Sequence, residues 1–270
     1  MNSAAVKPRI FAHRGASAFA PENTFAAFQK AIDDGADGIE FDVRLAKDGV
    51  PVVFHDSDLK RLAKIEHRVS YYTAAELSKI DVGSWFNRVF PRKADDKFST
   101  ETIPTLAELF DFLRDYKGLL YVELKGGDSA ISALAEVVCE LISQTDLLPN
   151  IVIKSFNLEA VKLAKRILPE VKTAALFEPK ILTILRKKKL ILDEAAKCRA
   201  DEISLHYSLA TKSFVRRARE NNLSTVIWTA DSIAWVKRAS DYGISAIITN
   251  DPAKLLAERE RVLSAAKPRV

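Results

Sequence analysis

The chain has 270 residues, of which 48% are hydrophobic, 9 are Gly and 10 are Pro, so it can form a sizeable core and has few segments that favour disorder. Its formal net charge of +5 suits a phosphate-bearing substrate, but it excludes few other functions. Residues 1–10 contain no apolar run of the length found in secretory signals, and no later apolar run approaches the ~18 residues of a membrane-spanning helix. We therefore expect a cytoplasmic protein without stable membrane insertion.

Two features that could indicate other functions have simpler explanations. Cys139 and Cys198 have neither a CxxC nor a metal-ligand spacing, so we expect reduced, packed thiols. The dense basic run Arg186–Lys189 is typical of a solvated helix face. Because no zinc-ligand pattern, RNA-binding signature or periodic basic stripe accompanies this run, we predict no nucleic-acid partner.

Strand-like and helix-like segments alternate along the chain. An apolar run ending at Ala12 predicts the first strand, residues 24–32 form a helix with apolar residues every three or four positions, and residues 38–43 form the second strand. From residue 105 onward the same reading predicts strands at 119–123, 151–155, 173–177, 202–205, 224–229 and 246–249, and helices at 130–142, 158–167, 181–198, 212–221, 233–242 and 253–263.

Eight strand–helix units in about 250 residues predict an α/β fold of the (β/α)8 TIM-barrel type. A doubly wound open sheet is the alternative, but its glycine-rich first turn is missing. We expect a single domain over residues 1–270, with an inserted subdomain at about 44–104 between the second and third barrel strands. The insertion is expected over the carboxyl-terminal face of the barrel. Its aromatic residues could line the substrate opening or form a small core of their own: Trp85, Phe86 and Phe90.

Carboxylates and a lysine stand at the ends of two predicted strands. Glu40 and Asp42 are two residues apart and share a face of their strand, and so do Glu123 and Lys125. Carboxylate oxygens are hard ligands that favour Mg²⁺, Ca²⁺ or Mn²⁺. The alternative is that Glu40 or Glu123 forms ion pairs with Lys125 or Arg14 and that no metal is bound.

Two histidines occupy similar positions just past strands. His13 and His55 could act as a general acid and a general base on opposite sides of a scissile bond, and Arg14 could bind an oxyanion. His67 lies in the polar insertion and is expected to be exposed. His206 ends the sixth strand and could face the site, but no role follows for it.

Several short sequence strings, taken in the order in which they occur, resemble those of the glycerophosphodiester phosphodiesterase family over roughly residues 9–257. No single string is decisive, but the ordered set is specific. The matching strings are His13-Arg14-Gly15, Pro21-Glu22-Asn23-Thr24, Glu40-Phe41-Asp42-Val43, Val53-Phe54-His55-Asp56, Ile103-Pro104-Thr105-Leu106, Glu123-Leu124-Lys125, Ser155-Phe156, Trp228-Thr229 and Thr249-Asn250-Asp251-Pro252.

The resemblance implies a metal-dependent enzyme that hydrolyses glycerophosphodiesters to sn-glycerol 3-phosphate and an alcohol. It places one divalent ion, Mg²⁺ or Ca²⁺, on Glu40, Asp42 and Glu123. The implied acid–base pair is His13 and His55. The remaining implied contacts are with the phosphate and the substrate, through Arg14, Lys125 and Trp228.

Two departures from the family pattern concern the edge of the site. The segment 57–64 has Arg61 but lacks the threonines that commonly follow the His-Asp pair, which puts the headgroup preference in doubt. Asn250 stands where an aspartate is usual.

Two alternatives remain. The first is an enzyme of the same fold, like a phospholipase D, that cleaves a lysophospholipid or another phosphodiester. The second is a catalytically silent barrel that serves as a binding module. The sequence leaves open the alcohol, the choice between Mg²⁺ and Ca²⁺, which histidine is the acid, and the oligomeric state.

Overall fold

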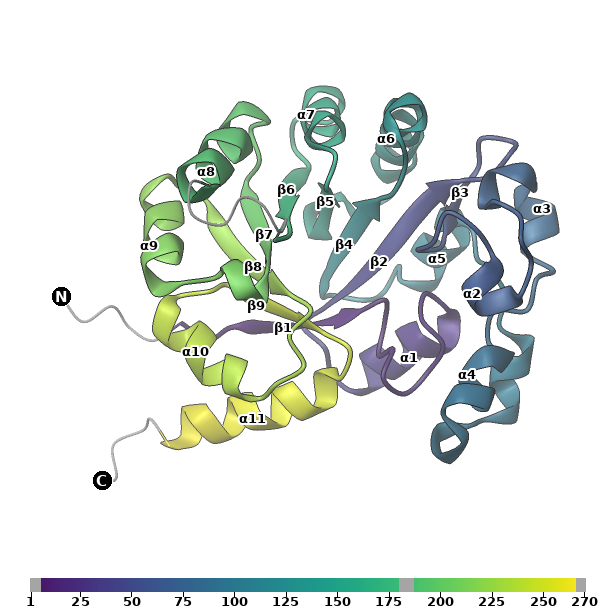
Figure 1. Ribbon diagram of the computed structural model, residues 1–270, viewed down its shortest axis with the longest axis horizontal. Coiled ribbons are helices and arrows are strands. Elements are labelled where there is room, and N and C mark those ends of the chain that lie inside the picture. The colour runs from purple at the N-terminus through teal and green to yellow at the C-terminus, as the bar shows by residue number, and fades with distance from the viewer. Residues whose placement is uncertain (1–5, 180–186, 266–270) are drawn as a thin grey trace.

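The computed structural model describes residues 6–179 and 187–265 and contains a closed barrel of eight parallel strands (Figure 1). Strand β1 pairs with both β2 and β9, which closes the barrel. The predicted TIM barrel is thus confirmed. The barrel strands are β1 (Arg9–His13), β2 (Gly38–Leu45), β4 (Leu119–Leu124), β5 (Ile151–Ser155), β6 (Lys172–Phe177), β7 (Glu202–His206), β8 (Ser224–Trp228) and β9 (Ala246–Thr249).

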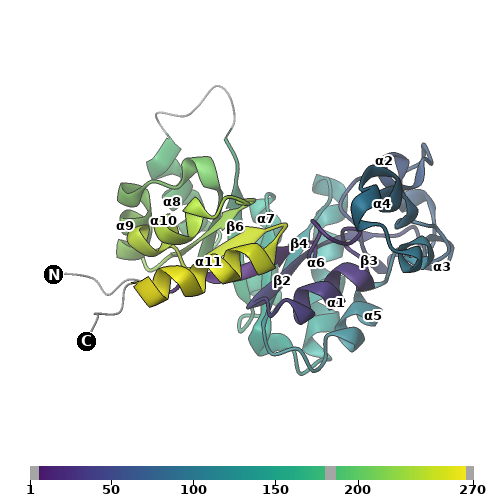
Figure 2. The same ribbon diagram turned by 90° about the horizontal axis from the view of Figure 1, so that it is seen from below.

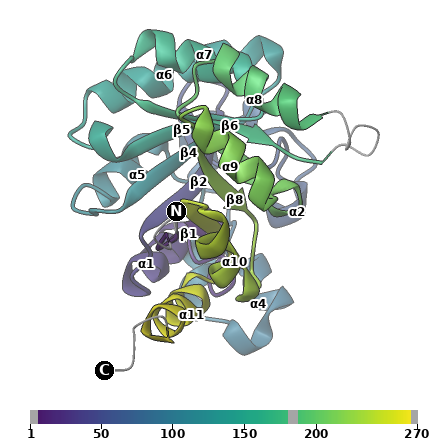
Figure 3. The ribbon, with the colours of Figure 1, turned by 90° about the vertical axis from the view of Figure 1, so that its left-hand side faces the viewer.

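Helices surround the barrel on its outside (Figure 3). They are α1 (Phe25–Asp33), α5 (Leu106–Phe112), α6 (Asp128–Ser143), α7 (Leu158–Ile167), α8 (Lys187–Lys197), α9 (Lys212–Glu220), α10 (Ala234–Tyr242) and α11 (Pro252–Ala265). Of the helix expected at 181–198, residues 181–186 lie outside the described residues, as does Arg186 of the basic run. In the part of the chain that the structure describes, no helix has the length and apolar character needed to cross a membrane.

The core has two layers. Apolar side chains from alternate strand positions fill the barrel interior, among them Phe11, Tyr121, Val152 and Val226. Larger clusters pack between the outer face of the sheet and the helices. Both cysteines are free and buried, and burial raises the pKa of the Cys139 thiol to about 11, as suits an inert packed residue.

Helix α5 is absent from the sequence prediction. It begins at a capping box, in which the Thr105 hydroxyl accepts the Glu108 N–H and the Glu108 carboxylate accepts the Thr105 N–H. The pattern Thr-x-x-Glu before an apolar run is a known helix start and was present in the sequence. This short helix, which begins soon after Pro104, could therefore have been predicted from its capping box although it is too short to show a clear apolar periodicity.

The insertion leaves the barrel at the carboxyl end of β2. Strand β3 (Pro51–Val53) pairs antiparallel with the last residues of β2. Short helices and 3₁₀ turns follow, and they build a small core of their own. These elements are α2 (Lys60–Ala63), η1 (Val69–Tyr71), α3 (Ala74–Leu77), α4 (Ser84–Val89), η2 (Pro91–Lys93) and η3 (Asp96–Thr100).

The insertion packs beside α1 and the loop between β1 and α1 (Figure 2). Phe86 is fully buried there against Phe98, Ala20 and Ala27, and Trp85 is half-buried. These aromatic side chains belong to the packing of the insertion, and Phe90 is the one of the three expected aromatics that is exposed.

Candidate active site

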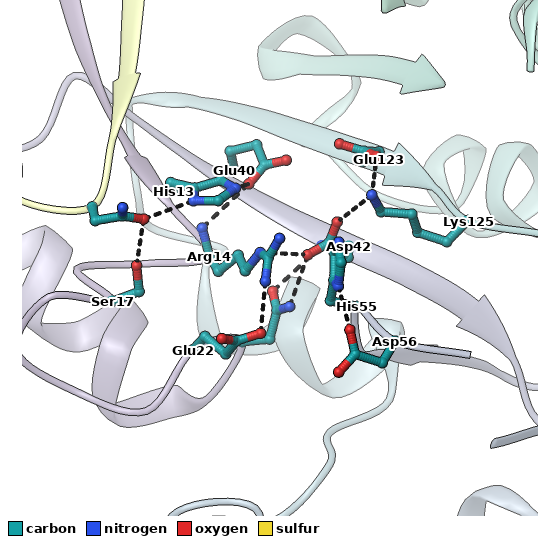
Figure 4. Close-up of polar contacts among 12 residues, drawn as sticks. His13, Arg14, Ser17, Glu22, Glu40, Asp42, His55, Asp56, Glu123 and Lys125 are labelled. Carbon is teal, nitrogen blue, oxygen red and sulfur yellow. Dashed lines mark hydrogen bonds and ion pairs between the residues drawn. The ribbon is translucent and has the colours of Figure 1, made fainter. Parts of the chain in front are cut away.

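Three buried carboxylates meet at the carboxyl ends of β2 and β4. The strand register aligns Asp42 with Glu123, and Glu40 lies two residues before Asp42 on the same face. One oxygen atom from each of the three side chains lies within 4.8 Å of the others. Glu40, Asp42 and Glu123 are called the carboxylate triad below. Figure 4 shows them converging with the two histidines, Arg14 and Lys125.

The donor set of the carboxylate triad fits a hard divalent cation. In each member one buried oxygen lies against a lysine ammonium: Glu40 Oε1 against Lys154, and Asp42 Oδ1 and Glu123 Oε1 against Lys125. Such oxygens are the ligands that Mg²⁺ and Ca²⁺ take in proteins. Ion pairs are present as well, because the Lys125 ammonium lies 3.3 Å from Asp42 Oδ1 and also contacts Glu123. The ion pairs considered from the sequence are therefore present, in a cluster whose three carboxylates could also hold a metal.

Arg14 connects the loop after β1 to the carboxylate triad. Its backbone adopts a left-handed conformation with φ of 56°, and its backbone N–H donates to Glu40 Oε2 at 3.2 Å. The guanidinium lies 3.2 Å from Asp42 Oδ2 and donates to Glu22 at 2.8 Å. Burial alone would raise the pKa of Asp42, but Arg14 and Lys125 outweigh burial and hold this pKa far below its ordinary value. Asp42 is therefore an anion at neutral pH.

His13 is held by a neutral partner. Its Nδ1 lies 2.7 Å from Asn250 Oδ1, and the Asn250 amide nitrogen donates to Asp231 Oδ2 at 2.8 Å, which fixes the orientation of the amide. The Asn250 oxygen therefore accepts a proton from Nδ1, and Nε2 carries the lone pair. Burial lowers the pKa of His13 below its ordinary value, although Glu40 acts in the opposite direction. The ring is neutral at pH 7.

His55 is held by a charged partner. It follows β3, and its Nδ1 lies 2.6 Å from Asp56 Oδ1. Arg61 of the insertion donates to Asp56 Oδ2 at 2.6 Å and also to Glu22. Burial would raise the pKa of Asp56, but the hydrogen bonds from His55 and Arg61 prevail and hold this pKa well below its ordinary value.

Lys154 is a site residue that the sequence analysis missed. It lies on β5 with a side chain only 2% exposed, and its ammonium is 2.7 Å from Glu40 Oε1 and 3.2 Å from Glu123 Oε2. Burial would lower the pKa of Lys154, but the two carboxylates outweigh burial and raise this pKa. The available signal was a lysine two residues after Val152 in a strand that is otherwise buried, because such a lysine needs an anionic partner.

Trp228 lies at the end of β8. Together with Phe156, His206 and Tyr207 it forms a group of ring contacts that is called the aromatic wall below. Trp228 packs edge-on against Phe156 at 5.4 Å and against His206 at 5.6 Å between ring centroids. The Lys125 ammonium lies 5.6 Å from the Phe156 ring, which joins this wall to the carboxylate triad. The His206 Nδ1 accepts the Ser208 N–H and lies 2.8 Å from the Ser208 hydroxyl oxygen.

His67 lies apart from these groups. It is exposed on the insertion, as expected, and its Nδ1 contacts the Tyr72 hydroxyl. Further residues to which the sequence reading gave no role in the site are Glu22, Asn23 and Asp231, whereas Arg61 was noted there as a match to the family pattern at the edge of the site.

Comparisons with known proteins agree with this arrangement. Residues 13–254 match the family model described as the glycerophosphoryl diester phosphodiesterase family. A glycerophosphodiester phosphodiesterase of Caldanaerobacter subterraneus subsp. tengcongensis is 32% identical, over 93% of this chain and 97% of that protein. A putative glycerophosphodiester phosphodiesterase of Bacillus subtilis is 31% identical, over 90% of this chain and 94% of that protein.

Solved structures show the same similarity. A phosphodiesterase of Oleispira antarctica in complex with the product sn-glycerol-3-phosphate is 26% identical, with a TM-score of 0.82 over 94% of this chain and 97% of that chain. A putative glycerophosphoryl diester phosphodiesterase of Silicibacter pomeroyi is 25% identical, with a TM-score of 0.85 over 96% of this chain and 95% of that chain.

Proposed function

Because the chain belongs to the glycerophosphoryl diester phosphodiesterase family and is a phosphodiesterase, we propose that it releases sn-glycerol 3-phosphate and an alcohol from glycerophosphodiesters by two-histidine, metal-dependent hydrolysis. The observation that carries this proposal is the buried carboxylate triad with His13 beside Glu40 and His55 beside Asp42. The relative from Oleispira, which binds sn-glycerol-3-phosphate as its product, supports a small-molecule substrate of this class. Residues 1–270 would form one catalytic domain, with the insertion at 44–104 contributing His55.

The carboxylate triad would hold one Mg²⁺ or Ca²⁺. A divalent ion bound there supplies positive charge next to the phosphodiester and neutralises the charge that builds up as the bond breaks. The three buried carboxylates support this assignment, because one oxygen from each lies within 4.8 Å of the others.

Arg14 and Lys125 would bind and orient the phosphate. Both side chains are partly exposed, at 17% and 15%, and both carry a fixed positive charge beside Asp42. The planar guanidinium of Arg14 offers several donors to phosphate oxygens, whereas Lys125 acts as a compact charge. Trp228 and Phe156 would border the alcohol.

The surroundings of the two histidines favour a division of roles. His13 is neutral, and its Nε2 lone pair is free to accept the proton of the attacking hydroxyl, from water or from the glycerol moiety itself. His55 has the negative charge of Asp56 at its Nδ1, which compensates a positive charge on the ring. We therefore assign His13 as the general base and His55 as the general acid that protonates the leaving alkoxide.

A lysophospholipid is the second candidate substrate. The observation in its favour is the partly exposed aromatic wall near Trp228, in which Phe156 is 40% and Tyr207 is 37% exposed. Apolar surface of this kind could accept an acyl chain. A turnover of lysophosphatidylcholine that exceeds the turnover of glycerophosphocholine would favour this candidate.

The experiment that tests the proposed function measures release of sn-glycerol 3-phosphate from glycerophosphocholine and glycerophosphoethanolamine. The assay is run with EDTA and again after Mg²⁺ or Ca²⁺ is restored. We expect EDTA to abolish release and one of the two ions to rescue it. Release that persists in EDTA would contradict the metal-dependent mechanism. No release with any ion would leave the lysophospholipid candidate and the silent barrel.

A further inference from the structure

Lys154 differs from the other two cations of the site in how it is held. Its side chain is 2% exposed, whereas those of Lys125 and Arg14 are 15% and 17% exposed. Each of its two ion-pair partners, Glu40 and Glu123, is itself buried. Arg14 and Lys125 can turn toward an arriving phosphate, but Lys154 has no route to solvent and stays with the carboxylate triad.

The position of Lys154 in the barrel explains this burial. The register of β5 aligns Lys154 with Glu123 of β4, so the two side chains are neighbours across the strands. Val152, two residues earlier, belongs to the apolar layer that fills the barrel interior. Lys154 shares that face and therefore lies next to the apolar layer, level with Glu123 and Asp42 in the strand register. A charge at this depth persists only when it is paired.

A count of charges indicates what Lys154 does. The three negative charges of the carboxylate triad are balanced by the three positive charges of Arg14, Lys125 and Lys154. Counted over these six groups, which leaves out the adjoining ion pairs of Glu22, Arg61 and Asp56, the site is neutral without metal. A divalent ion on the triad would raise its net charge to about +2, which suits a phosphodiester anion. Without Lys154 the site would carry one negative charge before the ion binds.

We propose that Lys154 is a permanent cation of the metal site that positions Glu40 and Glu123 in the metal-free protein, weakens the binding of the divalent ion, and leaves the metal-bound site positive enough to hold the substrate anion. This inference rests on the metal site of the proposed function. It assigns Lys154 a positioning role, since no contact of Lys154 with substrate is required.

The test compares the wild-type protein with Lys154→Met and Lys154→Gln. Ca²⁺ binding is measured by calorimetry, and the melting temperature is measured in EDTA and in excess Ca²⁺. In EDTA we expect both neutral variants to melt about 10 °C below the wild type, because a buried ion pair loses one partner. We expect their affinity for Ca²⁺ to rise about tenfold or more, because a repelling charge near the ion is gone. Excess Ca²⁺ should therefore recover most of the lost melting temperature.

Two further variants serve as controls. Lys154→Arg keeps the charge, and we expect its Ca²⁺ affinity to stay within about threefold of wild type. Lys165→Met removes a partly buried, ion-paired lysine at the amino end of the barrel, where Lys165 pairs with Asp201 and is 16% exposed. We expect Lys165→Met to lower the melting temperature equally with and without Ca²⁺, with unchanged Ca²⁺ affinity.

Several outcomes would overturn the proposal. Neutral Lys154 variants with an unchanged Ca²⁺ affinity would assign the lysine a purely structural role. Variants that lose binding of sn-glycerol 3-phosphate while keeping wild-type Ca²⁺ affinity would make Lys154 a substrate ligand. Variants that fail to fold even in excess Ca²⁺ would also contradict it, because the ion should replace the lost charge. A wild-type protein that binds neither Ca²⁺ nor Mg²⁺ would overturn the metal site of the proposed function, and this inference with it.

Discussion

His13 and His55 belong to two different parts of the molecule, and each part holds its histidine in a different way. The barrel holds His13 through Asn250, a neutral amide that Asp231 fixes in place. The insertion holds His55 through Asp56, a carboxylate that Arg61 keeps ionised and oriented. Two side chains of the same kind thereby acquire different chemistry, because a neutral acceptor selects a tautomer whereas a carboxylate also compensates a positive charge.

The largest expected effect comes from removing either histidine. His13→Ala and His55→Ala should each lower kcat by ~10²–10⁴-fold on glycerophosphocholine, because each loses one proton transfer. The two variants should differ on a glycerophosphodiester with a p-nitrophenol leaving group, which needs no protonation. On that substrate we expect His55→Ala to regain at least about tenfold of its loss, and His13→Ala to regain none.

His67→Ala is the matched control for both variants, because His67 lies on the insertion and contacts Tyr72 rather than the site. It should keep wild-type kcat on both substrates. Equal losses of the two active-site variants on both substrates would contradict the assignment of His55 as the acid.

A smaller effect is expected from Asp56→Asn, which keeps a hydrogen-bonding partner for His55 and removes its charge. We expect kcat on glycerophosphocholine to fall ~10–100-fold, because the ring is held but a positive charge on it is no longer compensated. Asp58→Asn is the control, since Asp58 is part of the same loop and its carboxylate accepts the Lys60 N–H. A variant Asp56→Asn with wild-type kcat would show that the carboxylate does not serve the acid.

A site residue could be predicted from the sequence where its pattern lies within a single strand or helix, and not where it depends on contacts between distant segments. Glu40 and Asp42 were identifiable because two carboxylates at i and i+2 on an apolar strand share one face, and this needs only a strand. The barrel was predictable for a similar reason, since each strand and helix has its own periodicity. The outcome for Arg61 was mixed. The family pattern marked it, but its hydrogen bonds to Glu22 join residues 39 positions apart and depend on how the insertion docks.

Lys154 and Asp231 could not be placed in the site from the sequence for the same reason. Lys154 meets Glu40 only because β2, β4 and β5 are neighbours in the closed barrel. Asp231 follows β8, and its contacts with Asn250 depend on the loop after β9. Both interactions join strands whose order the sequence indicates but whose register it leaves open, and a shift of one residue would turn each side chain to the other face.

A smaller effect is expected from Asn250→Asp, which should shift the pH dependence of kcat/KM. This variant tests how the barrel holds His13. A carboxylate at this position favours the protonated form of His13 and should raise the His13 pKa, which burial lowers in the wild type. The acidic limb of kcat/KM should therefore move to higher pH by about one unit, while the rate at pH 8 to 9 changes little. Asn221→Asp, an exposed substitution on α9, is the control and should leave the limb in place. A limb that stays in place or moves to lower pH in Asn250→Asp would contradict the role of Asn250.

The smallest expected effect is on stability rather than on rate. The His13 pKa is lower in the folded protein than its ordinary value of 6.5, so the unfolded chain binds a proton that the folded protein does not. The contribution of neutral His13 to the free energy of unfolding is complete above pH 6.5. It is lost as the pH falls below that value, with a slope of at most about 1.4 kcal/mol per pH unit for one proton.

In His13→Asn, whose side chain does not titrate, the free energy of unfolding should fall less between pH 7.5 and pH 5.5 than in the wild type. Urea unfolding at several pH values measures this difference. Identical pH dependence in His13→Asn and the wild type would mean that His13 takes up its proton equally in both states, and the neutral ring assigned to the barrel side would then be wrong.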